Sequence, residues 1–98
     1  MWVFRNSDVV VNGFLNIEPE HRIRSIVRFS AFVLGASRGH PCHMPSSVPT
    51  TKMRAVDEDV YVLHLLNHWW VTYRVLPDCS AAEGIVRFVT MGKMMQAI

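Results

Sequence analysis

The sequence has little cysteine, little charge and no long apolar run. Its 98 residues include two cysteines, Cys42 and Cys79, which allow at most one disulfide. That is too few for the disulfide frameworks that hold small secreted domains together. The residues at the amino terminus also do not match a signal peptide. A reducing compartment is the simpler interpretation, and we expect a cytoplasmic protein.

The longest stretch without a charged residue runs over positions 60–73. A helix that crosses a bilayer needs about 20 mostly apolar residues. This stretch is shorter and includes the polar residues His64, Asn67 and His68. We therefore do not expect membrane insertion.

The chain also lacks complete catalytic and cofactor motifs. No glycine-rich segment is followed by the Lys-Ser/Thr pair of a phosphate-binding loop. The consecutive acids Asp57, Glu58 and Asp59 are typical of the first turn of a helix, where carboxylates favour the positive end of the helix dipole. We therefore expect a protein that is not an enzyme and uses no cofactor.

What the sequence does contain is apolar, since 50% of its residues are hydrophobic and only 18% are charged. This composition excludes intrinsic disorder, and the length suits one domain over 1–98. The formal net charge is +2, and all but two of the ten Lys and Arg residues are arginine. Guanidinium groups pair with carboxylates and phosphates in a bidentate way, which favours them at interfaces.

The first third of the chain predicts a β-hairpin followed by a helix. Asn12-Gly13 lies between β-forming residues and suits a type I′ turn, which predicts a hairpin over 9–17. Residues 2–4 either add a third strand or pack beside the hairpin. Pro19, flanked by two acids, then indicates the first turn of a helix that reaches about Leu34.

This helix has apolar residues on more than one side. Side chains at intervals of three and four predict a core face, formed by Ile23, Ile26, Val27, Ser30 and Val33. Phe29 and Phe32 then point to a different side. Such a helix either lies between other elements or offers a face to a partner.

The rest of the chain predicts a long loop and two more helices. A loop rich in Pro and Gly covers 35–56, longer than most connections within a domain. A central, buried helix is expected over 60–76, although 71–75 is β-prone. Ser80 and Glu83 form a capping box that predicts a third helix. The expected fold is α+β, an N-terminal β-hairpin followed by three helices, with an all-α three-helix domain as the alternative.

Arginine and aromatic side chains indicate the function that we expect. Interface centres are enriched in both types. The candidate binding residues are Arg22, Arg24, Arg28, Phe29, Phe32, Arg87 and Lys93. We interpret the chain as a small non-enzymatic binding protein, a subunit, adaptor or inhibitor, that contacts a protein partner or further copies of itself.

Two alternatives remain open from the sequence. Arg22, Arg24 and Arg28 could grip the phosphates of a nucleic acid along one helix stripe. His64 and His68, four residues apart on the expected helix, could share a metal ion. Further ligands could then come from His40, Cys42 and His43. Otherwise the pair lies at the edge of the core with hydrogen-bonded rings.

Overall fold

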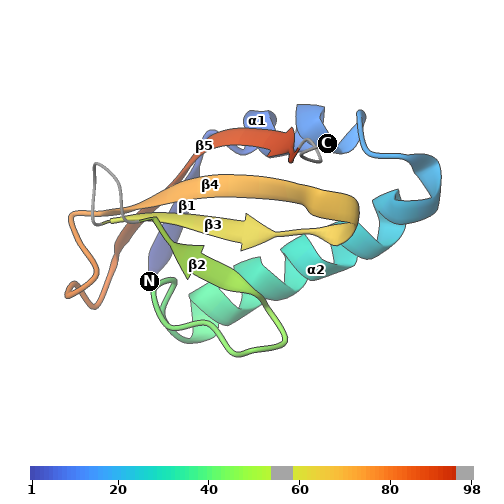
Figure 1. The fold of residues 1–98 in the computed structure, drawn as a ribbon. Helices are drawn as coiled ribbons and strands as arrows, with labels where there is room; N and C mark the ends of the chain where they lie inside the picture. Colours follow the sequence, from blue (N-terminus) through green and yellow to red (C-terminus); the bar gives the residue numbers. More distant parts are fainter. Residues whose placement is uncertain (54–58, 95–98) are drawn as a thin grey trace.

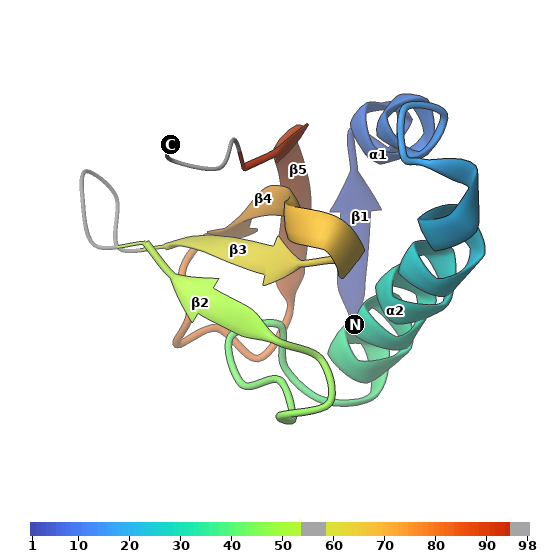
Figure 2. The ribbon, with the colours of Figure 1, turned by 45° about the vertical axis from the view of Figure 1, so that its right-hand side comes forward.

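Two helices cover one face of a five-stranded sheet in the computed structural model, which describes residues 1–53 and 59–94 (Figures 1 and 2). The helices are α1 (Ser7–Phe14) and α2 (Pro19–Arg38), and a short 3-10 turn, η1, covers Leu66–His68. The strands are β1 (Trp2–Arg5), β2 (Thr50–Lys52), β3 (Val60–His64), β4 (Trp69–Leu76) and β5 (Gly84–Lys93). Their order is β1-β5-β4-β3-β2, with β1 parallel to β5 and all other neighbours antiparallel. The mixed α+β class is therefore confirmed, whereas the N-terminal hairpin and the three helices are wrong.

The predicted hairpin is replaced by α1. Gly13 does not form a turn, because none of the described glycines has a positive φ. It allows a close approach instead, since a Cβ at this position would lie 2.1 Å from Sδ of Met91 on β5. Gly13 is therefore needed for the contact between α1 and the sheet. A rule based on neighbouring residues cannot predict this contact, because Met91 is distant in the sequence.

The predicted central helix is replaced by β3, η1 and β4. Tyr61 and Leu63 are buried and their neighbours are less so, which is the period of two expected of a strand. Asn67 and His68 both have a positive φ in the tight connection. Tyrosine, valine and tryptophan suit a pleated surface, so the β-propensity noted for 71–75 extends over the whole of β4.

The predicted third helix is replaced by β5. The amide and hydroxyl of Ser80 donate to Oδ1 of Asp78 at 2.8 and 2.6 Å, so Ser80 belongs to a turn around Asp78 rather than to a helix cap. The carboxylate of Glu83 pairs with the amino group of Met1 instead of an amide (3.2 Å). Asp57 and Glu58, expected at a helix start, lie outside the described residues.

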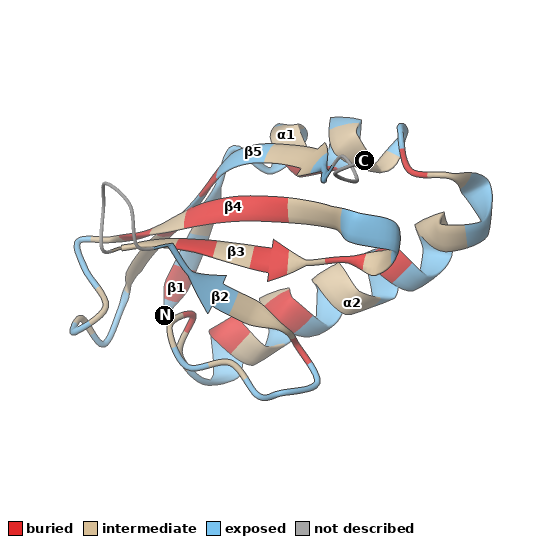
Figure 3. Ribbon diagram, viewed as in Figure 1, coloured by how far each residue is buried: buried red, intermediate tan, exposed pale blue. Residues whose placement is uncertain are grey.

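The helix predicted to begin around Pro19 is confirmed as α2, and it extends to Arg38. Most of its predicted core face is exposed. Ser25, Phe32 and Ala36 are buried and Phe29 packs against the core. Of the predicted core residues, Val33 packs against the core, whereas Ile23, Ile26, Val27 and Ser30 are exposed. Buried and exposed positions alternate along α2 in Figure 3. Both sets follow helical spacing, but phenyl rings bury more apolar area than aliphatic side chains.

The loop between α2 and β2 is anchored to the sheet. Cys42 forms a disulfide with Cys79 (Cα–Cα 5.9 Å), and the hydroxyl of Tyr73 donates to the carbonyl of Pro41 at 2.9 Å. Burial raises the pKa of Tyr73 above its ordinary range, so the hydroxyl stays a donor. Disulfides persist mainly in oxidising compartments, so the cysteines do not support the predicted cytoplasmic location.

The double variant Cys42→Ser, Cys79→Ser should be less stable than the wild type by about 2–4 kcal/mol, because the disulfide closes a loop of 37 residues in the unfolded chain. Urea unfolding followed by circular dichroism measures this difference. Reduction of the wild type should produce the same loss. Equal midpoints for the oxidised wild type and the variant would contradict the pairing.

Glu18 ties the start of α2 to the sheet. Its carboxylate accepts a hydrogen bond from Nε1 of Trp69 at 2.9 Å and pairs with the ammonium of Lys93. These contacts, chiefly the one with Lys93, lower the pKa of Glu18 from 4.5 to about 2. Because the folded-state pKa is depressed, this stabilisation is present above pH 4.5 and is lost as the pH falls toward 2.

Glu18→Gln should therefore destabilise the protein at neutral pH, and its difference from the wild type should shrink between about pH 4.5 and 2. Urea midpoints across this range measure the effect. Asp8→Asn, which removes an exposed acid of α1, serves as the control. Parallel profiles for the wild type and Glu18→Gln would show that the carboxylate has no such role.

Candidate binding site

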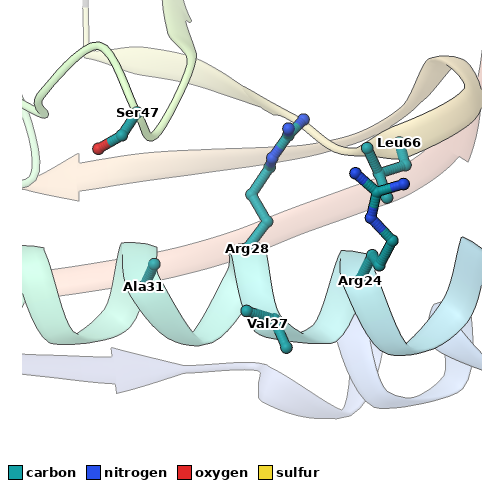
Figure 4. Close-up of a pocket in the computed structure, with 6 residues that line it drawn as sticks. All are labelled: Arg24, Val27, Arg28, Ala31, Ser47 and Leu66. Atoms are coloured by element: carbon teal, nitrogen blue, oxygen red, sulfur yellow. The ribbon is translucent and has the colours of Figure 1, made fainter.

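Arg24 and Arg28 line a pocket of about 320 Å³ between α2 and the opposite loop. Val27, Ala31, Ser47 and Leu66 complete its lining. Figure 4 shows both guanidinium groups rising from α2 on the same side, with Leu66 beside Arg24 and Ser47 on the opposite loop. Arg28 also donates to the carbonyl of His64 at 3.4 Å. The structure therefore brings two of the candidate cations together at one pocket.

Arg22 lies apart from this pair and stabilises the fold. Its guanidinium donates to the carbonyls of Phe14 (3.0 Å), Leu15 (3.3 Å) and Ile17 (3.0 Å). These carbonyls lie at and just after the end of α1, where helix carbonyls lack a partner within the helix. The predicted stripe of three phosphate-binding arginines is therefore reduced to Arg24 and Arg28.

The outer face of α2 carries an apolar stripe. Ile23, Val27 and Leu34 are 74%, 61% and 50% exposed. With Ser30 they follow a spacing of four, three and four residues, so they form a line on the side of the helix opposite Phe32 and Ala36. We call Ile23, Val27, Ser30 and Leu34 the outer stripe.

The aromatic part of the predicted site packs into the core. Phe32 is 0% exposed, with its ring centroid 4.8 Å from that of Tyr73. Phe29 is partly buried, and its ring centroid lies 5.3 Å from that of Phe88. Sequence reasoning placed the surface on the phenyl rings and missed the aliphatic stripe, although the period of the stripe was visible.

The two remaining candidate cations lie on β5, far from the pocket of α2 in the chain. Lys93 pairs with Glu18 and is therefore engaged within the fold. Arg87 is exposed, and its neighbours Val86 and Phe88 are buried. Because side chains alternate along a strand, Arg87 lies on the sheet face that the helices do not cover.

The two histidines of the alternative metal site lie on different elements. His64 ends β3 and its Nε2 lies 2.9 Å from the hydroxyl of Thr51, while His68 belongs to η1 rather than to a helix. Cys42 is used in the disulfide, and His40 contacts the carbonyl of Ala81 at 2.8 Å. Among residues 1–53 and 59–94, no group of three or more His, Cys, Asp or Glu could hold a metal ion.

Arg22→Gln should lower the free energy of unfolding by about 2 kcal/mol, because the three carbonyls would lose a charged donor. Arg24→Gln should change it by less than about 0.5 kcal/mol, as expected for an exposed side chain. Urea unfolding of both variants separates the two roles. Equal losses would show that Arg22 is no more structural than Arg24.

Comparison with known proteins finds no match among protein-family models, curated proteins or solved structures. In the part of the chain that the structure describes, none of the helices has the length and apolar character of a membrane span. The function therefore has to be inferred from the exposed residues themselves.

Proposed function

We propose that this chain is a non-enzymatic binding subunit that pairs with a second copy of itself through the outer stripe of α2. The observation that carries the proposal is a helix apolar on two opposite sides, with only one side covered by the described residues. Phe32 and Ala36 are fully buried, whereas Ile23 and Val27 are mostly exposed. Removing such a stripe from water would stabilise an association.

The spacing of the stripe suits an antiparallel pair of helices. A two-fold axis midway between positions 28 and 29 would set Ile23 opposite the partner's Leu34, and Val27 opposite the partner's Ser30. Intervals of four and three residues are those with which helices interlock at shallow crossing angles. A two-fold pair also buries the same patch on both copies, so one stripe is enough to close the assembly.

Charges at the two ends of α2 fit the same arrangement. Glu20 lies in the first turn and Arg38 in the last turn of α2, and both are exposed. They occupy the same flank of the stripe, because 18 positions correspond to five helical turns. The two-fold axis would place Glu20 and the partner's Arg38 on the same side of the interface, about one residue rise apart along the helix axis. Each end of the interface would then carry one opposite-charge pair.

Arg24 and Arg28 would border this interface. Arginine at the rim of an apolar patch covers it with its aliphatic stem and keeps its charge in water. The mechanism is non-covalent recognition.

The mass in solution tests the proposal. The wild type should have twice the chain mass in size-exclusion chromatography with light scattering across the micromolar range, and Val27→Glu should have the mass of one chain, because a carboxylate would be buried against Ser30 and its neighbours. Val11→Glu is the matched control: Val11 of α1 is 60% exposed, against 61% for Val27, but lies outside the stripe. A wild type that is monomeric throughout, or equal loss in both variants, would overturn the proposal.

The pair of Glu20 and the partner's Arg38 allows a second, independent test of the dimer. Arg38→Glu should weaken the dimer by placing two carboxylates together, and the double variant Glu20→Arg, Arg38→Glu should restore it. If the double variant is no tighter than Arg38→Glu, the antiparallel register is wrong.

A further inference from the structure

The sheet face that the helices leave open carries a row of three arginines. Arg5 of β1 lies opposite Arg87 of β5, and Arg87 lies opposite Arg74 of β4. All three alternate with residues that pack toward the helices, such as Val86 and Val75. Figure 2 shows both helices on the other side of the sheet. Residues from three distant parts of the chain therefore form one cationic row.

Such a row opposes the stability of the sheet. Like charges directly opposite each other on neighbouring strands are destabilising. Asp59, whose carbonyl accepts the amide of Val75 at 3.1 Å, brings an acidic residue to the β3 end of the row. Local conflicts of this kind are expected at functional or strained sites.

An aromatic surface lies farther along the same face. Trp70 is paired with Gly92 on β5 and with His64 on β3. The indole lies over Gly92, because a Cβ there would come within 2.9 Å of the ring. The glycine lets the ring lie flat across the neighbouring strand.

The indole also forms one wall of a shallow hollow of about 250 Å³. The other lining residues are Met53, Val62, His64, Thr72 and Met94. The surface that lines the hollow is mostly apolar. One of its residues, Met94, is 59% exposed. The hollow suits a flat apolar group stacked on the indole.

We infer that this open face binds single-stranded nucleic acid, with the phosphates on the arginine row and a base stacked on Trp70. A positive surface beside aromatic rings is the arrangement by which sheets hold unpaired strands. Positions 70 and 74 of β4 are about 13 Å apart along the strand, so a few linked nucleotides would connect the arginine row with Trp70. An acidic peptide would satisfy the arginines but offers no flat ring to the indole. The inference uses no residue of the outer stripe, so it does not depend on the dimer.

Fluorescence anisotropy tests this inference with labelled oligouridylate and oligothymidylate, each about 12 nucleotides long. Both should bind at low salt, and the logarithm of the affinity should fall linearly with the logarithm of salt concentration. Arg87→Gln, an exposed change, should weaken binding several-fold and reduce the slope by about 0.7, the value for one phosphate contact on a single strand. Trp70→Leu should weaken binding about tenfold or more with less change of slope.

Lys52→Gln is the control, since it removes one exposed cation of β2 and should leave binding unchanged. Lys52 lies opposite the buried Tyr61, on the helix side of the sheet. Val27→Glu should also bind, which separates this result from the test of the dimer. Three outcomes would overturn the inference: no binding at low salt, greater loss in Lys52→Gln than in Arg87→Gln, or polyglutamate binding as tight as the oligonucleotides and unaffected by Trp70→Leu. The unfolding midpoint of each variant checks the fold, and the exposed Arg87→Gln change keeps the test decisive if Trp70→Leu does not fold.

Discussion

The packing of two phenyl rings of α2 against the sheet determines which side chains of this helix are exposed to solvent. Phe32 lies against Tyr73 and Phe88, and Phe29 lies between Phe14 and Phe88, with ring centroids 4.8 to 6.4 Å apart. Aromatic side chains contribute the largest apolar areas to a small core, so their burial decides the rotation of the helix. Once the rings point inward, Ile23, Val27 and Leu34 must point outward. The outer stripe is therefore a consequence of the core.

The two proposed binding surfaces lie on opposite sides of the molecule. The outer stripe is exposed on the side of α2 opposite the buried Phe32 and Ala36. The arginine row lies on the other face of the sheet from the two helices, which are together on one side of the sheet in Figure 2. A pair of chains joined through α2 would therefore present two open sheet faces, one at each end.

Local sequence rules succeeded where the signal and the structure were both local. Pro19 beside acidic residues correctly predicted the start of α2, because helix starts depend on groups within one turn. They failed at Asn12-Gly13, where Gly13 serves contact with Met91, nearly eighty positions away. They failed again over 60–76, because short apolar runs have no period that separates helix from strand. The predicted capping box at Ser80 does not form, because Ser80 donates its hydrogen bonds to Asp78.

The amino-acid sequence by itself determined that α2 begins at its proline and that this helix is apolar on more than one side. The mixed class was predicted correctly, but from a hairpin at a place where the structure has α1. Only the tertiary structure decided which of these sides is buried, that Cys42 meets Cys79, and that Arg22 binds carbonyls rather than a ligand. It alone aligned Arg5, Arg74 and Arg87, since strand register depends on pairing between distant segments. Helix starts are encoded within a few neighbouring residues, whereas the side that a helix buries and the partners of a strand are set by everything that packs against them.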